Sequence, residues 1–266
     1  MPTQPEFLLL LATVLALAAT IQVLTGFGFG LLALAILGTG MDLRDAMVVI
    51  APAGLLLNIT LFLRLRKEFS LDDTIYLLIA CLVGVPAGVW LLLNLGPRSL
   101  RWLLAAVMIG TVVHRVWMAQ RKRAHLWHPV KAGIPCGLLS GILGGAFGAG
   151  GPPVVTYLVN RPVNRFRHVA TVQVAAAIAS LVRVGEFARG GLYRQADGTA
   201  ILAAMFAVLA GVLVGGRLLN RFSDAGVRRA VLGLLFLGGL YYLHAALRAP
   251  GDVGVETGVP AETLYP

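Results

Sequence analysis

The sequence predicts an all-α, polytopic membrane protein of two inverted repeats, each a re-entrant helical hairpin plus three transmembrane helices. The prediction rests on composition, on two glycine-rich interruptions, and on segments that recur in the same order. Of the 266 residues, 58% are hydrophobic and 13% are charged, and the mean hydropathy is +0.83. These values exclude an ordinary soluble domain. Apolar stretches cover nearly the whole chain, which leaves no length for a soluble catalytic domain.

Hydropathy divides the chain into a first repeat over 1–120, a basic linker over 121–131, a second repeat over 132–248 and a flexible tail over 249–266. The expected elements are a hairpin over 7–40 with helices over 46–63, 74–95 and 102–118, then a hairpin over 132–160 with helices over 169–187, 199–216 and 230–247. Most stretches suffice for the roughly 30 Å hydrocarbon layer, which takes about 20 helical residues. The start of the chain lacks the basic region and cleavage site of a secretory signal, so we expect the first helix to be retained.

Two glycine-rich breaks occupy matching places in the two halves. The segment TGFGFGLLALAILGTG (25–40) superposes on GAFGAGGPPVVTYLVN (145–160) with an offset of 120 residues, and LVGVPAGVWLLLN on LAGVLVGGRLLN with an offset of 127. The first superposition pairs Phe27 with Phe147, Gly28 with Gly148 and Gly30 with Gly150. A short apolar arm follows each break (30–40 and 152–160). Eleven helical residues rise only about 16 Å, so the arm cannot cross and the chain is expected to turn back.

The basic residues test this topology independently. If both arms of each hairpin crossed the membrane, the loop Lys and Arg would divide 11 against 10 between its two sides, whereas re-entrant hairpins divide them 15 against 6. The positive-inside rule then places the basic loops in the cytoplasm and both termini outside. Each half then crosses the membrane three times, an odd number, so the two halves have opposite orientations in the bilayer. The net charge of +10 is therefore interpreted as a topology signal, with no nucleic acid partner.

A helix that begins inside the membrane suits an anion, because its first amide groups lack acceptors and its dipole is positive there. Two such ends would face one pocket near the midplane. The residues expected to bind substrate are Gly26, Phe27, Gly28 and Gly30 at the first break, Gly148, Gly150, Gly151 and Pro152 at the second, and the polar Gln22, Thr25, Asn58, Gln173 and Tyr157. Thr156 and Ser180 are further candidates. The alternative is that the glycines serve only close helix packing and that the hydroxyls bond their own helices.

Four other polar residues have two interpretations each. Arg183 and Glu186 lie three apart on one expected helix, where they would either pair with each other or act as a gate or counter-charge. His114 and Arg115 lie near a helix end, where snorkelling explains them, and His114 is alternatively a proton carrier. The two cysteines, Cys81 and Cys136, lack CxxC spacing and are interpreted as packing residues. Neither a metal site nor a cofactor is expected.

The paired breaks TGFGFG and GGAFGAGGPP, at the starts of two related halves, resemble those of the TauE/SafE sulfite exporter family over residues from about 7 to 247. The resemblance implies export of a small sulfur-containing oxyanion, such as sulfite or an organosulfonate, by a non-enzymatic protein of the plasma or inner membrane. A proton or other ion would drive transport. Two alternatives stay open: a membrane-embedded lipid phosphatase, although the breaks carry no carboxylate, arginine or histidine, and a passive small-solute channel.

Overall fold

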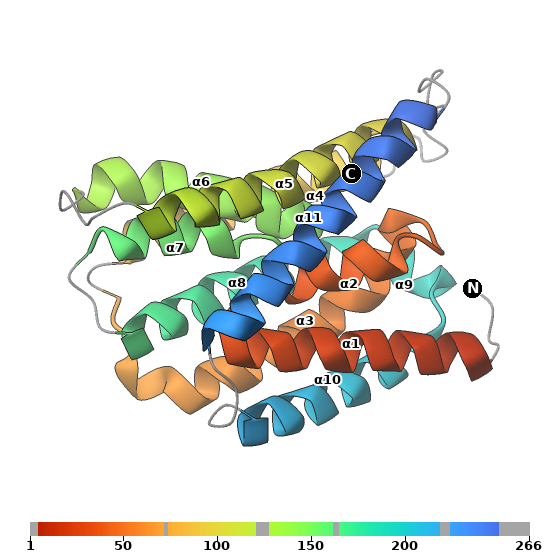
Figure 1. Ribbon diagram of the computed structural model, residues 1–266, viewed down its shortest axis with the longest axis horizontal. Coiled ribbons are helices and arrows are strands. Elements are labelled where there is room, and N and C mark those ends of the chain that lie inside the picture. The colour runs from red at the N-terminus through yellow and green to blue at the C-terminus, as the bar shows by residue number, and fades with distance from the viewer. Residues whose placement is uncertain (1–4, 72–73, 121–127, 162–164, 219–223, 250–266) are drawn as a thin grey trace.

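In the computed structural model of the chain, residues 5–71, 74–120, 128–161, 165–218 and 224–249 are described (Figure 1). They form eleven α-helices and one 3-10 turn: α1 Pro5–Thr25, α2 Phe29–Leu37, α3 Leu43–Leu65, η1 Arg66–Glu68, α4 Ile75–Asn94, α5 Pro97–Gln120, α6 Pro129–Phe147, α7 Gly151–Val159, α8 Arg165–Arg189, α9 Leu192–Gln195, α10 Gly198–Leu218 and α11 Asp224–Arg248. Most of the predicted linker, and the predicted tail from residue 250 onward, lie outside the described residues.

Eight of these helices are long and apolar enough to cross a membrane, namely α1, α3, α4, α5, α6, α8, α10 and α11. Each overlaps one of the eight apolar stretches of the sequence. The prediction of an all-helical, multi-pass membrane protein is therefore confirmed for the part of the chain that the structure describes. The remaining helices, α2, α7 and α9, are too short to span the hydrocarbon layer.

Both short central helices follow a glycine with positive φ. The helix α1 ends next to Gly26 (φ 82°), whose N–H donates to the carbonyl of Gln22 at 2.7 Å. The helix α6 ends at Gly148 (φ 65°), whose N–H donates to the carbonyl of Gly144 at 3.0 Å. This left-handed conformation ends a helix at little cost only in glycine. Nine helical residues, as in α2 and α7, rise about 13.5 Å.

The ends of the helices align the two breaks differently from the amino-acid sequence. The helices α1 and α6 end at Thr25 and Phe147, and α2 and α7 begin at Phe29 and Gly151, so corresponding limits lie 122 residues apart. Gly26 therefore corresponds to Gly148, and the letter-based offset of 120 is two residues out of register. The reason is that GFGFG repeats every two residues, so the amino acids match in either register, whereas the helix limits match in only one.

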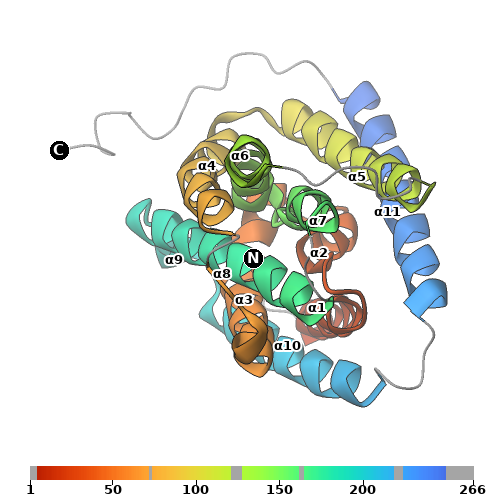
Figure 2. The same cartoon turned by 90° about the vertical axis from the view of Figure 1, so that its left-hand side faces the viewer.

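The helices pack in pairs that connect the two halves of the sequence (Figure 2). The most extensive contacts join α4 to α6 and α1 to α10, followed by α5 with α11 and α3 with α8. The pair α5 and α11 lies along one side of the bundle (Figures 1 and 2). No half of the chain forms a separate bundle, because each half's first helix packs against a helix of the other half.

Glycines allow the closest of these contacts. In α4, a β-carbon on Gly84 or Gly88 would overlap backbone atoms of α6, and Gly141 of α6 faces α4 in the same way. In α10, a β-carbon on Gly211 would overlap the carbonyl oxygen of Ala16 in α1, and one on Gly215 would lie 2.8 Å from Cβ of Val23. Without a hydrophobic force between helices in lipid, such small residues let backbones approach and gain van der Waals contact. The glycines paired by the offset of 127 therefore have matching packing roles.

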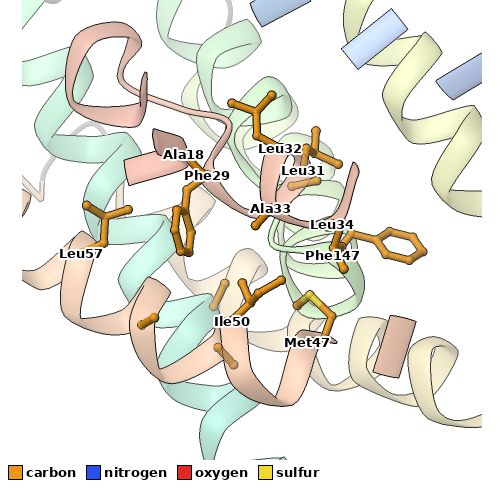
Figure 3. Packing of buried hydrophobic residues seen from close by; sticks show 14 of the residues in the cluster. Ala18, Phe29, Leu31, Leu32, Ala33, Leu34, Met47, Ile50, Leu57 and Phe147 are labelled. Carbon is orange, nitrogen blue, oxygen red and sulfur yellow. The ribbon is translucent and has the colours of Figure 1, made fainter. Parts of the chain in front are cut away.

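The helix α2 is buried among the spans, which fixes the first break in the interior. Leu31, Ala33 and Leu34 are at most 1% exposed. Figure 3 shows Phe29 projecting from α2 toward α3, where its ring would lie 3.3 Å from a β-carbon on Gly54. A helix that is apolar on all sides is stable only in such surroundings.

Candidate functional site

The two helix breaks meet inside the bundle. A β-carbon on Gly30, in the first turn of α2, would lie 2.8 Å from the carbonyl oxygen of Phe147 and 2.9 Å from that of Gly148. A β-carbon on Gly148 would lie 3.3 Å from the Cα of Gly30. Position 30 thus has no room for a side chain. The first turn of α2 therefore lies against the backbone of the second break.

A cavity of about 30 Å³ lies beside this contact. A cavity needs about 10–15 Å³ to hold one water molecule, so this cavity has room for more than one. Its walls come from α1, α2, α3, α6, α8 and the second break: Gln22, Phe29, Gly30, Ile50, Gly54, Asn58, Gly144, Gly148, Gly150, Ala176, Ala179, Ser180 and Arg183. Arg183 is the one charged residue among these lining residues.

Gln22 holds the first break together. Its side-chain oxygen accepts a hydrogen bond from the backbone N–H of Phe29 at 3.0 Å, which closes the N-terminus of α2. Its amide nitrogen donates to Oδ1 of Asn58 at 2.7 Å and to Oε1 of Gln173 at 3.3 Å. The amide of Gln173 donates in turn to the carbonyl of Gly26 at 3.2 Å. These buried amides are therefore satisfied by one another and by the break.

Ser180 connects this network to a buried arginine. Its hydroxyl oxygen accepts hydrogen bonds from Nδ2 of Asn58 and from Nη2 of Arg183, both at 3.4 Å. A hydroxyl has two acceptor lone pairs and one hydrogen to donate. Because both contacts use the oxygen as acceptor, the hydrogen stays available to donate into the cavity.

Arg183 is 2% exposed within a candidate membrane span. Its Nη1 donates to the carbonyl of Gly144, and its Nε is buried without a hydrogen-bond partner. Glu186 forms its ion pair with Arg189 at 3.2 Å instead. The predicted pairing of Arg183 with Glu186 is therefore wrong, because the Glu186 side chain, 35% exposed, lies toward the surface with Arg189. Among the described residues Arg183 has no carboxylate partner, and a buried cation without one is costly.

The two short helices differ in the amides that they offer. The N–H of Phe29 is bound by Gln22, whereas the next amide of α2, on Gly30, has no acceptor inside the helix. In α7 the second and third residues are Pro152 and Pro153, which have no N–H. The α2 end is thus the better donor for an anion.

Phe27 and Thr25 stabilise the first break and do not line the cavity. The guanidinium of Arg115 lies 3.8 Å from the ring centroid of Phe27, which is 5% exposed. A β-carbon on Gly151 would lie 3.2 Å from Cβ of Phe27. The hydroxyl of Thr25 donates to the carbonyls of Ile21 and Phe27 at 2.8 and 2.9 Å. Phe27 therefore joins the two breaks from outside the cavity.

Gly151, which contacts Phe27, and three more predicted residues also lie outside the cavity lining. Pro152 lines a separate groove together with Thr156. Tyr157 is 1% exposed, and its ring faces Gly133 of α6. Gly28 precedes α2 with φ 106°. Of the predicted substrate-binding residues, the cavity lining contains Gln22, Gly30, Asn58, Gly148 and Gly150, and Gln173 and Gly26 contact it through hydrogen bonds.

The sequence did not single out the apolar part of the lining, which consists of Phe29, Ile50, Gly54, Gly144, Ala176 and Ala179. Small and apolar residues are common in every span, so they carry no signal of their own. Helical spacing is the available signal. Gly54 and Ile50 lie four and eight residues before Asn58 on α3 and so share its face. Ala179 and Ala176 precede Arg183 by four and seven residues on α8 in the same way.

The two cysteines are free. The thiol of Cys81 is buried, 3.9 Å from Oγ of Ser140 and 3.8 Å from the carbonyl of Ala175. Among the residues that the structure describes, no group of three or more His, Cys, Asp or Glu is placed to hold a metal ion.

Comparison with known proteins identifies the family. The family model described as sulfite exporter TauE/SafE matches residues 10–242, a range that includes both breaks and the whole cavity lining. No curated protein and no solved structure matches the chain. Because the match extends over most of the 266 residues, the chain belongs to the TauE/SafE sulfite exporter family of membrane transporters.

Proposed function

We propose that the protein is a secondary transporter that exports a small sulfur-containing oxyanion, such as sulfite or an organosulfonate. The observation that carries this proposal is Arg183, a buried cation beside the meeting point of the two breaks, without a carboxylate partner among the described residues. A bound oxyanion would supply the missing negative charge. Membership of a transporter family supports the same conclusion.

In the proposed site, the anion lies between α8 and the N-terminus of α2. Arg183 supplies the charge and a free donor at Nε, and Ser180 supplies its hydroxyl hydrogen. The amide of Gly30 is the third donor, at the positive end of the α2 dipole. Gln22 and Asn58 position these groups through their hydrogen bonds. Charge-assisted bonds of this kind favour a tetrahedral or pyramidal oxyanion over a neutral solute.

We propose that residues 1–120 and 132–248 form inverted repeats that give alternating access to this site. The pattern of contacts supports the relation, since α4 packs on α6 as α10 packs on α1, and α3 and α5 pack on their own counterparts α8 and α11. A two-fold axis that exchanges α3 with α8 and α5 with α11, and maps the pair α4 and α6 onto α10 and α1, would produce this pattern. Rocking of one set of helices against the other would then open the cavity to each side in turn.

In the proposed topology, α2 and α7 are the returning arms of re-entrant hairpins. Their length of nine residues, about half a membrane crossing, and their contacts with α1 and α6 support this. The 15 to 6 division of basic residues supports a topology in the plasma or inner membrane with both termini outside the cell and the basic loops in the cytoplasm. The expected partners are the bilayer, the oxyanion, and a coupling proton or other ion.

The proposal is tested by Arg183→Gln in proteoliposomes loaded with radiolabelled sulfite, thiosulfate or an organosulfonate. Hydrogen bonds to charged groups contribute about 1.5–3 kcal/mol, so the apparent affinity for the transported anion should fall about 10- to 100-fold. Arg189→Gln is the matched control, because it removes an equal charge from the same helix at an exposed position. Equal loss in both variants, or wild-type affinity in Arg183→Gln, would contradict the proposed site.

The same vesicles separate the two alternative functions. A lipid phosphatase would release phosphate from a polyprenyl pyrophosphate, and the cavity lining has no carboxylate or histidine for that chemistry. A passive channel would give flux that neither saturates with the anion nor responds to an imposed ion gradient. Saturable sulfite flux that changes with a proton gradient, without phosphate release, is the outcome expected of a transporter.

A further inference from the structure

A second, larger hollow lies on the outside of the bundle. This groove has a volume of about 420 Å³ and runs between α5, α6 and α7. Its walls are almost entirely apolar, with Gly110 of α5, Leu139 of α6 and Pro153 of α7 among the lining residues. Ala106 and Leu139 are exposed, so the groove is open to the surroundings of the helices. The helices α5 and α6 are candidate membrane spans, so the groove opens toward lipid.

The groove has no equivalent in the other half of the chain. There α11, the counterpart of α5, packs directly on α2, the counterpart of α7. A β-carbon on Gly238 of α11 would lie 3.2 Å from Cβ of Ala35, and the hydroxyl of Tyr242 donates to the carbonyl of Leu34 at 2.7 Å. On α5, by contrast, a β-carbon on Gly110 would meet no atom within 4 Å. The helix α11 is thus packed along α2, whereas the groove lies between most of its counterpart α5 and the helices α6 and α7.

The groove is polar and basic at one end. Nε2 of His114 and Oγ1 of Thr156 are hydrogen-bonded at 2.9 Å across it. Cys136 of α6 lines the groove. Lys131 lies five residues before it, toward the same end of the helix, and is exposed. Basic clusters at the end of membrane helices attract anionic headgroups.

We propose that this groove binds one acyl chain of an anionic phospholipid, with the headgroup at the basic end near Lys131. Apolar walls that open to the membrane suit a hydrocarbon chain, and the positive charge at one end suits a phosphate group. The lipid takes the place that a packed helix occupies in the other half. It also contacts α7, the helix that begins at the second break.

The test uses the full-length protein purified in detergent with phosphatidylglycerol, and counts retained lipids by native mass spectrometry. Gly110→Phe fills the groove from a position with open space, so we expect at least a threefold fall in retained phosphatidylglycerol. Gly233→Phe is the matched control, since Gly233 of α11 is exposed, equally open and outside the groove. Lys131→Gln should lower the preference for phosphatidylglycerol over phosphatidylcholine with the same chains.

Unchanged retention in Gly110→Phe would overturn the proposal, and so would equal retention of phosphatidylcholine by the wild type. If Gly110→Phe fails to fold, Ala106→Leu fills the same groove from an exposed position and is read in the same way. Quenching of tryptophan fluorescence by phosphatidylglycerol with brominated chains gives a second readout. That quenching should fall in the groove variants and stay at the wild-type level in Gly233→Phe.

Discussion

At the scale of single residues, the site depends on polar groups that satisfy one another inside lipid. Gln22 is 6% exposed and uses both its oxygen and its nitrogen, for Phe29 on one side and for Asn58 and Gln173 on the other. An unsatisfied amide in hydrocarbon costs several kcal/mol, so these bonds hold the side chains in one arrangement. Among the residues that line the cavity, Arg183 alone is charged, and it has no carboxylate partner among the described residues.

The close approach of the two breaks gives a prediction for Gly30. In Gly30→Ala the new β-carbon would meet two backbone carbonyls within 3.0 Å, and backbone atoms cannot move aside as a side chain can. Overpacking of this kind costs about 1–3 kcal/mol. We therefore expect a lower melting temperature and reduced sulfite transport.

Gly185→Ala is the control for this change. Gly185 lies on α8, two residues from Arg183, and a β-carbon there would meet no atom within 4 Å. Its alanine variant should keep the wild-type melting temperature and transport rate. If Gly30→Ala behaves like Gly185→Ala, the two breaks do not approach as closely as described.

At the scale of elements, the ends of the helices decide where the chain turns. The left-handed glycines end α1 and α6 in the interior, whereas side-chain caps begin the helices nearer the surface. Asp42 accepts from the N–H of Arg44 at 2.8 Å before α3. Asp197 accepts from the N–H of Thr199 at 2.8 Å and from its hydroxyl at 2.7 Å before α10. Such caps satisfy amides that the helix leaves without acceptors.

The Asp197 cap predicts a pH dependence. The hydrogen bonds from the Thr199 hydroxyl and amide lower the pKa of the Asp197 carboxyl below its ordinary value of 3.8. A carboxyl whose pKa is lower in the folded state stabilises the fold above the unfolded pKa, and this contribution is lost as the pH falls through the folded pKa. Asp197→Asn should therefore lower the melting temperature at pH 7.

The difference in melting temperature between wild type and Asp197→Asn should shrink as the pH falls below about 3.8. Asp42→Asn, which alters the cap of a different helix, α3, serves as the comparison. A constant difference from pH 7 down to pH 3 would show that the charge of Asp197 does not contribute to the cap.

At the scale of the whole molecule, the helix contacts made by the first half of the chain resemble those made by the second. The helices α4 and α10 each pack through paired glycines against the first helix of the other half. The halves differ at the groove, where α5 contacts α7 at one end through His114 and Thr156, whereas α11 packs directly on α2. A molecule with two conformations related by symmetry is expected to be asymmetric in either one.

The proposed topology predicts which positions are accessible from each side of the membrane. Single cysteines at Thr39, after α2, and at Arg194, in α9, should react with a membrane-impermeant maleimide added to intact cells. Cysteines at Lys67 and Asn160 should react only after permeabilisation. Cys81 and Cys136 are first replaced by alanine to remove background labelling.

Thr39 is the decisive position in this experiment. If α1 and α2 together crossed the membrane, Thr39 would lie on the side opposite to the N-terminus and would require permeabilisation. Labelling of Thr39 and Asn160 from the same side would contradict the inverted arrangement of the two hairpins.

The sequence by itself determined the class of fold, because hydropathy and segment length are local properties that a membrane constrains strongly. It likewise determined that two glycine-rich breaks occur, and it pointed to Gln22, Asn58 and Arg183 as polar residues in apolar spans. Only the tertiary structure decided which of these share one cavity. It also showed that Glu186 pairs with Arg189, that Tyr157 faces Gly133, and that the breaks align at 122 residues. The physical reason is that the burial of a side chain, its hydrogen-bonding partner and the alignment of the two breaks depend on contacts between helices far apart in the chain. A local sequence pattern does not predict such contacts.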